Sequence, residues 1–465
     1  MEGLSVKQDV DLILAGGTAI TVDGERRVIR DAGIAIKKDK IVFVGKKKSL
    51  LSQYQAKRTY ECTDKVISPG FVNAHIHFSH HLSRGLIPDN LGGSPWSNYI
   101  HSKVSPYIKA RNEIWAAKAL LVEVLKSGTT AFMEPGSYHP YDTIQSGIEE
   151  IGIKGMMGRR SFDLVSLGHG SLKENADKIL KIHERFLNEF SGSKRRIKPM
   201  VTIVGMGRFT DRLVVESKKM ADRHGVRLHM HLANYIETVH ETKERTGYRP
   251  VEHLEKLGVL DENVVLVHMV HVSQREVEIL AKRGVKVIHC PSTALKLSYG
   301  LAYDRFPEML DAGIPVAIAS DASDCSNYHD MVRIMYLAAV LHKDLRQDPE
   351  IMGAEVAIEM ATINGAKTMG LEKEIGSLEI GKRADIAIFD TRRPEWRPLY
   401  NEVQNLVYAA TGDSVETVII DGKIVMEKRK VLTVDEEEVL TRLDAEIADL
   451  KTRIKAPLVS KWKFV

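Results

Sequence analysis

The sequence has little cysteine, no long apolar run and no excess of one charge. Its 465 residues include three cysteines, Cys62, Cys290 and Cys325, too few and too scattered for a disulfide framework or a zinc ribbon. No apolar run reaches the ~20 residues that a membrane span needs, and the first residues lack the basic and apolar regions of a signal peptide. Lysine and arginine number 66 against 62 aspartate and glutamate, so no basic surface is expected. We therefore expect a cytoplasmic protein that acts on a small molecule, with no nucleic-acid or membrane partner.

The two ends of the chain share a pattern of short alternating strands. Residues 11–65 and 384–435 both alternate apolar and polar positions and carry turn pairs such as Asp23-Gly24 and Asp421-Gly422. This pattern predicts one small β-sandwich built from residues 1–65 and 376–435. The first part of residues 436–465 has helical periodicity. This pattern predicts a C-terminal helix followed by a tail, with the helix on the surface or at a subunit contact.

The long middle segment alternates strand-like and helix-like runs, which predicts an α/β fold, a (β/α)8 TIM barrel, over residues 66–375. The expected strands are residues 66–73, 129–133, 155–162, 200–204, 227–231, 264–268, 286–289 and 316–320. The expected helices include residues 113–126, 172–190, 212–224, 274–283 and 329–342. Active sites of this fold lie at the carboxyl ends of several strands.

Histidines and an aspartate occupy those strand ends. His75 and His77 follow the first strand at a spacing of two, so both side chains can face one point. The fifth, sixth and eighth strands end at His231, His268 and Asp321. Such a set of nitrogen and oxygen donors suits zinc, iron, cobalt or manganese. The sequence therefore predicts a metal site at the mouth of the barrel.

These residues lie in motifs that resemble the amidohydrolase superfamily, in the branch of triazine hydrolases and of adenosine, cytosine and guanine deaminases. The matching stretches are PGFVNAHIHF, SGTTAF, HMHLAN, VHMVHV, VIHCPSTALKLSYG, AGIPVAIASDASDCSNYHDM and GSLEIGKRADIAIFD. The resemblance implies that one metal is held by His75, His77, His231 and Asp321. It also implies that His268 approaches the substrate and helps polarise it or move protons. Binuclear relatives carry a bridging lysine on a middle strand, and the fourth expected strand has none. We therefore expect one divalent ion per chain, with zinc as the first choice.

Two departures from the family pattern shape the expected reaction. Deaminases of this branch have glutamate where this chain has Asn234, and an amide cannot act as a general acid. The family's Ser-Asn-Leu-Lys-Leu stretch begins with Thr293-Ala294 in this chain. Ala294 therefore stands where the family has an asparagine that commonly contacts polar heterocycles. We therefore predict a metal-dependent hydrolase of carbon–nitrogen bonds other than peptide bonds that cleaves an acyclic urea, carbamate, thiocarbamate or amide, similar to phenylurea and molinate hydrolases. Asp321 and His268 are its predicted catalytic residues.

Two alternatives remain open. In the first, the enzyme deaminates an aminated heterocycle of triazine, cytosine, guanine or adenosine type, and His268 or Asp324 has taken over the acid role. In the second, the chain is a non-catalytic scaffold protein, although such proteins typically lose ligand histidines. Asn234, His271 and His81 are predicted to contact the substrate. We also expect a homo-oligomer.

Overall fold

The computed structural model describes residues 7–164, 174–192, 195–205, 207–454, 456–457 and 459–463. The described chain divides into two compact units. Unit 1 holds the described residues of Met1–Asn73, Val122–Ala131 and Asp330–Asp435; unit 2 holds those of Ala74–Leu121, Phe132–His329 and Glu436–Val465. The predicted domain boundaries near residues 65 and 375 stay predictions.

Unit 1 contains two sheets, and the larger one combines strands from both ends of the chain. A four-stranded sheet has the order β5-β4-β1-β6, and a seven-stranded sheet has the order β22-β21-β20-β19-β7-β2-β3. The N-terminal strands are β1 (Gln8–Ala15), β2 (Thr18–Ile20), β3 (Val28–Arg30), β4 (Ala32–Lys37), β5 (Lys40–Lys46), β6 (Tyr54–Glu61) and β7 (Lys65–Pro69). The C-terminal strands are β19 (Ile386–Asp390), β20 (Val415–Ile420), β21 (Lys423–Glu427) and β22 (Lys430–Val431). Leu14, Ile34, Ile67, Ile388 and Ile419 are fully buried in a core shared by both ends.

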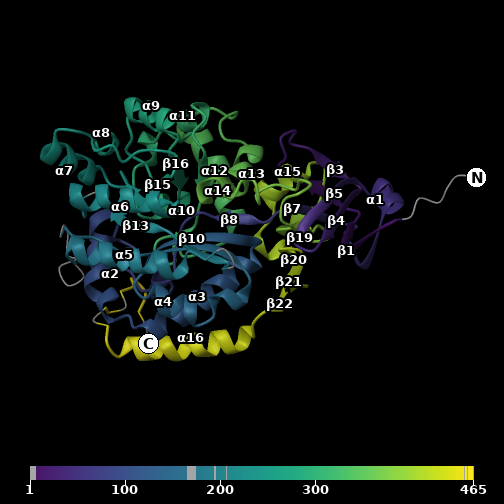
Figure 1. The fold of residues 1–465 in the computed structure, drawn as a ribbon, viewed down its shortest axis with the longest axis horizontal. Coiled ribbons are helices and arrows are strands. Elements are labelled where there is room, and N and C mark those ends of the chain that lie inside the picture. The colour runs from purple at the N-terminus through teal and green to yellow at the C-terminus, as the bar shows by residue number, and fades with distance from the viewer. Residues whose placement is uncertain are drawn as a thin grey trace, which may run out of the picture. The chain divides into compact units, whose positions relative to one another are not determined.

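Two further sheets supply the barrel strands, in the orders β12-β11-β10-β8 and β13-β14-β15-β16-β17 (Figure 1). Their strands are β8 (Phe71–Asn73), β10 (Thr129–Ser137), β11 (Lys154–Arg159), β12 (Ile197–Pro199), β13 (Val201–Gly205), β14 (Leu228–Leu232), β15 (Val264–His268), β16 (Lys286–His289) and β17 (Val316–Ile318). Strands β13 to β17 pair in parallel. The fold is α/β, a (β/α)8 barrel with a small β-sandwich from the N- and C-terminal segments, which confirms the predicted class.

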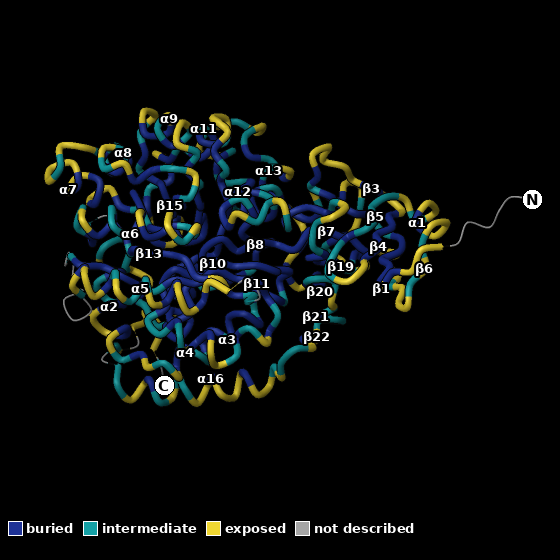
Figure 2. Tube along the Cα trace, viewed as in Figure 1, coloured by how far each residue is buried: buried dark blue, intermediate teal, exposed yellow. Residues whose placement is uncertain are grey.

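Helices follow most barrel strands, as the sequence pattern predicted. They include α3 (Ala110–Lys126), α5 (Ala176–Phe190), α6 (Asp211–His224), α7 (Ile236–Thr246), α9 (Gln274–Arg283), α11 (Phe306–Asp311) and α12 (Met331–Arg346). The first two residues of the predicted helix 172–190 lie outside the described residues. Strands β10, β13 and β15 are dark blue in Figure 2, because they are buried between the helices and the barrel interior.

The expected strand 66–73 is two strands, β7 and β8, separated at Gly70. The amide of Gly70 donates to the carbonyl of Asp385, whereas the amide of Phe71 donates to that of Gly128. The chain thus changes hydrogen-bonding partners at Gly70. A side chain there would collide with Thr130, so glycine permits the close approach.

The C-terminal helix α16 (Glu436–Lys451) lies in unit 2 and contacts the first turn of α3. Arg111 forms an ion pair with Asp449 at 3.0 Å, and Nδ2 of Asn112 donates to Glu446. Val439, Leu443 and Leu450 are buried on the same helix. Among the helices of the described residues, none combines the length and the apolarity needed to cross a bilayer.

Candidate active site

Two short strand segments bring the metal motif and the aspartate together. β9 (Ile76–His77) pairs in parallel with β18 (Asp321–Ala322), and the amide of Asp321 donates to the carbonyl of His75 at 2.9 Å. As a result, Oδ1 of Asp321 lies 3.4 Å from Nε2 of His75 and 3.4 Å from Nε2 of His77. The two Nε2 atoms are 3.0 Å apart.

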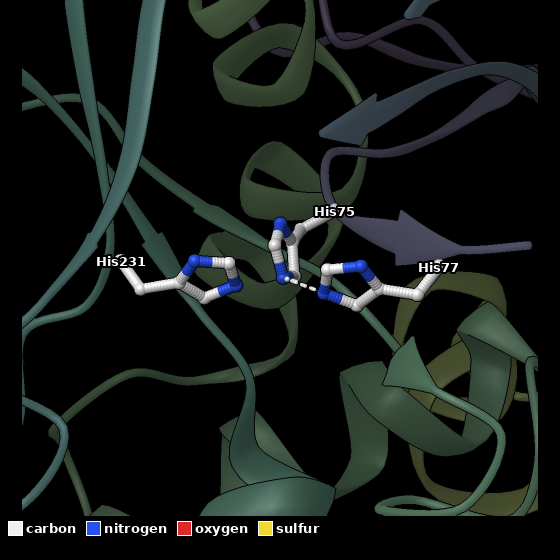
Figure 3. Close-up of side chains that lie close together, drawn as sticks. All are labelled: His75, His77 and His231. Atoms are coloured by element: carbon white, nitrogen blue, oxygen red, sulfur yellow. Dashed lines mark hydrogen bonds between the residues drawn. The ribbon is translucent and has the colours of Figure 1, made fainter. Parts of the chain in front are cut away.

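The neighbouring strands add two more histidines. His231 lies in β14, and His268 ends β15, where it pairs with Leu232. The ring of His231 stacks on that of His77, with centroids 5.5 Å apart, and on that of His268 at 5.3 Å. Figure 3 shows the rings of His75 and His77 meeting that of His231 from the opposite side of the site. The sequence-predicted ligands therefore converge.

The donor atoms are spaced as the ligands of one metal ion would be. Those of His75, His77 and His231 lie within 4.8 Å of one another, and so do those of His75, His268 and Asp321. Ligands bound at about 2.0–2.1 Å to one tetrahedral ion lie about 3.3–3.4 Å from each other. The separations of 3.0 and 3.4 Å at His75, His77 and Asp321 come close to this value. The residues present thus fit a divalent ion such as zinc.

Burial sets the protonation of these groups. It lowers the pKa of His77 and of His231 well below the usual histidine value and lowers the pKa of His268 to about 4. Burial alone would raise the pKa of Asp321, but the hydrogen bond to His75 and the neighbouring imidazoles outweigh it and hold that pKa well below its usual value. At neutral pH these three histidines are therefore neutral and the carboxylate is ionised, the state that binds a metal ion.

Two of the predicted site residues have a backbone conformation that side chains rarely adopt. His268 has φ of 74° and Asp321 has φ of 62°, both in the left-handed region. Non-glycine residues in this region carry conformational strain, which tends to occur at functional sites. His268 is the last residue of β15, and Asp321 begins the short strand β18 that follows β17.

Residues that the sequence reasoning missed orient the ligands. Nδ1 of His75 lies 3.3 Å from Nε2 of His229, and Nδ1 of His231 hydrogen-bonds with the carbonyl of Val204. Such contacts fix the tautomer that presents Nε2 to a metal. Gly136 leaves room for the ring of His77, since a Cβ there would lie 3.0 Å from Cε1. The second His-x-His spacing, at residues 229 and 231, was a signal in the sequence for His229.

A pocket in unit 2 opens onto this cluster. Its walls include His77, His231, His268 and Asp321, together with Asn234 and His80. Two of the residues predicted to contact the substrate, His81 and His271, do not line this pocket. Nδ1 of His81 hydrogen-bonds with Oγ of Ser323 at 2.9 Å, and His271 lines a separate hollow beside Tyr303. The substrate roles of His81, His271 and Asn234 stay predictions.

Asp324 is connected to the pocket through His80. Its carboxylate accepts hydrogen bonds from Oγ of Ser83 at 2.6 Å and from Nδ1 of His80 at 3.0 Å. The Nε2 atom of His80 is buried and has no hydrogen-bond partner in the described part of the chain. His80 therefore presents a polar atom to the pocket, whereas Asp324 holds its ring.

The pocket also has polar residues that the sequence reasoning did not select: Trp96, Ser97, His101, Arg160 and Arg208. The first three come from α2 (Gly93–Lys103), and the arginines follow β11 and β13. The rule that found His231, a polar residue at the end of a barrel strand, would also have found both arginines.

Curated relatives match the chain along most of its length. A 5-methylthioadenosine/S-adenosylhomocysteine deaminase from Moorella thermoacetica is 35% identical over 436 residues, which cover 93% of this chain and 98% of the relative. A 5'-deoxyadenosine deaminase from Methanopyrus kandleri is 32% identical over 434 residues, covering 92% and 96%. Both relatives are named for the deamination of an adenosine-type heterocycle.

These relatives show that the predicted cleavage of an acyclic urea, carbamate, thiocarbamate or amide is wrong. That prediction took Asn234 to remove the acid needed for ring protonation. However, other side chains that can carry a proton, such as His268, line the same pocket, so the loss of one glutamate does not exclude deamination. The names of the relatives point to the first alternative, deamination of an aminated heterocycle.

Structural similarity and a family model agree on the wider classification. An adenosine deaminase from Xanthomonas campestris with bound zinc has a TM-score of 0.89 and 24% sequence identity, covering 96% of this chain and 100% of the other; at this identity the likeness concerns the fold. The model of the Amidohydrolase family matches residues 66–425. The chain is a hydrolase that acts on a small molecule at a carbon–nitrogen bond other than a peptide bond, and it belongs to the amidohydrolase family.

Proposed function

We propose that this protein is an aminohydrolase that removes ammonia from the adenine ring of an adenosine-type nucleoside. The observation that carries the proposal is the match of more than nine-tenths of the chain to relatives named as such deaminases. The cluster of His75, His77, His231 and Asp321 supports it, because this donor set can hold the metal that a hydrolytic deamination uses.

One divalent ion per chain, zinc as first choice, would be held by these four side chains. When bound, it would lower the pKa of a water molecule so that the water can lose a proton at neutral pH. A single ion is favoured because β13 (Val201–Gly205) contains no lysine to bridge a second one. The predicted homo-oligomer stays a prediction.

The protein's own groups would handle the protons of the reaction. Water adds to the ring carbon that bears the amino group, and one of its protons goes to a ring nitrogen. Its second proton goes to the amino group, which leaves as ammonia when the carbon–nitrogen bond breaks and the carbonyl forms. The ionised Asp321 accepts the proton from water. Nε2 of His268 lies 4.0 Å from Oδ2 of Asp321, and a neutral His268 can receive that proton and pass it to the ring. The amide of Asn234 can orient the ring or the water.

The test is a screen of the zinc-loaded protein against adenosine, 5'-deoxyadenosine, 5'-methylthioadenosine, S-adenosylhomocysteine, cytosine and an aminated triazine. Ammonia release and the ultraviolet change from adenine to hypoxanthine are measured together. We expect turnover of at least one adenine nucleoside and its loss in Asp321→Asn, with Arg275→Gln as a matched surface control because Arg275 has a side chain 78% exposed. Fully metallated protein that deaminates no adenine nucleoside would contradict the proposal.

A further inference from the structure

Two buried arginines face the candidate active site without a negative partner. Arg160 and Arg208 are each 8% exposed and line the same pocket as His77, His231 and Asp321. Among the described residues, no aspartate or glutamate forms an ion pair with either guanidinium. The internal positions that the structure leaves out, residues 165–173, 193–194, 206, 455 and 458, contain no aspartate or glutamate. Two like charges therefore share one buried wall.

Neutral side chains of α2 hold both arginines in place. Nη2 of Arg160 donates to Nε2 of His101 at 2.7 Å, and Nη2 of Arg208 donates to Oγ of Ser97 at 3.2 Å. Residues 97 and 101 are one helical turn apart, so a single helix face positions the pair. Burial lowers the pKa of His101 well below the usual value, so the ring accepts the hydrogen bond as a neutral group. The partners fix the geometry and leave the charge uncompensated.

Three hydrogen-bond donors in this wall lack acceptors. Nε of Arg160, Nη1 of Arg208 and Nε1 of Trp96 are buried, and none of them has a hydrogen-bond partner within the described residues. Buried donors of this kind are normally satisfied, and buried charges are normally paired. Burial, aided by the charge of Arg160, lowers the pKa of Arg208 to about 10, which leaves it cationic at neutral pH. The wall thus offers unpaired donors and two positive charges to acceptor oxygens with negative charge.

We propose that Arg160 and Arg208 form a subsite for an oxyanion on the substrate, a carboxylate or a phosphate, with Trp96 as an additional donor. The inference rests on the proposed function for the identity of the reacting ring. It narrows the substrate to a nucleoside whose sugar substituent ends in an anionic group. Planar guanidinium groups bind both kinds of oxyanion through paired N–H donors. A kinetic comparison of substrates distinguishes a carboxylate from a phosphate as the bound group.

The kinetic test compares substrates that differ in this group: S-adenosylhomocysteine with a carboxylate, adenosine 5'-monophosphate with a phosphate, and the uncharged 5'-methylthioadenosine. We expect kcat/KM to favour one anionic substrate, and Arg208→Gln or Arg160→Gln to lower that value by roughly 10- to 100-fold, the range of a charge-assisted hydrogen bond. 5'-Methylthioadenosine lacks the anionic group, so its kcat/KM should fall less than that of the anionic substrate, and the ratio of the two values should fall in both variants. Arg275→Gln is the matched control, and Arg208→Lys should restore part of the preference.

A direct binding test separates this inference from the proposed function. Inorganic phosphate and acetate are titrated calorimetrically into the zinc-loaded wild type and into the arginine variants, with metal content measured in each. Binding that is lost in Arg160→Gln and Arg208→Gln at full metal content supports the subsite, even if no nucleoside is deaminated. Deamination without preference for an anionic substrate, together with anion binding that the arginine variants leave unchanged, overturns the subsite and leaves the proposed function standing.

Discussion

Gly136→Ala tests whether the ring of His77 is held in place for metal binding. Gly136 lies in β10 and has no side chain to collide with the ring. An added Cβ would lie 3.0 Å from Cε1 of His77 and closer still to Nδ1. Ordinary contacts between such atoms are about 3.5–4.0 Å, and the shorter contact, to Nδ1, sets the movement of the ring at about 1 Å or more.

His77 has little room for that movement. Its ring is perpendicular to that of His75, with centroids 4.5 Å apart, and it stacks on that of His231. Metal–ligand distances tolerate about 0.2 Å, so the shift weakens one of four ligands. Changes at residues that support ligands typically cost about 10–100-fold in metal affinity. This corresponds to about 1.4–2.8 kcal/mol of binding free energy.

The measurement is competition for zinc between the protein and a chromophoric chelator, with elemental analysis of the purified protein. Gly192→Ala is the matched control, because a Cβ there meets nothing within 4 Å. We expect weaker zinc binding in Gly136→Ala only, with the same far-ultraviolet circular dichroism in both variants. Equal zinc affinity in the two variants would show that the ring of His77 does not need the space that glycine leaves at position 136.

Three further outcomes are expected. Asn234→Glu restores a carboxylate in the pocket and should raise ammonia release from the best adenine nucleoside at least about tenfold, since general acid–base groups contribute about 10²–10⁴; a slower variant contradicts this. Burial lowers the pKa of His183 to about 4, so the contribution of the neutral ring to the free energy of unfolding is complete above pH 6.5. About 3 kcal/mol of it is lost as the pH falls toward 4. In urea unfolding, His183→Gln should lose less stability over this pH range than the wild type, and equal losses in the two proteins would contradict this. Ser273 caps α9 in a capping box with Glu276, and Ser273→Ala should lower the free energy of unfolding by about 1 kcal/mol; an unchanged urea midpoint would show that the cap is dispensable.

The sequence by itself determined the barrel, the split sandwich and the placement of the clustered histidines. Strand periodicity and the residue that ends each strand are local properties, and parallel strands place their carboxyl ends on one side of the sheet. For this reason His231, His268 and Asp321 were predicted to meet the His75–His77 pair, and the structure brings them together. Their roles in binding and catalysis stay predictions. The reaction predicted from the sequence was wrong because that prediction assumed that only the residue at position 234, here Asn234, could pass a proton to the ring.

Only the tertiary structure decided which loop and helix residues share the pocket. The directions of His81 and His271 depend on packing against Ser323 and beside Tyr303, and no local pattern encodes those contacts. The convergence of Arg160 and Arg208 likewise depends on α2, whose residues 97 and 101 hold guanidiniums from two different loops. Local periodicity fixes where a strand ends, whereas the direction of a side chain in a loop is set by neighbours that are distant in the chain.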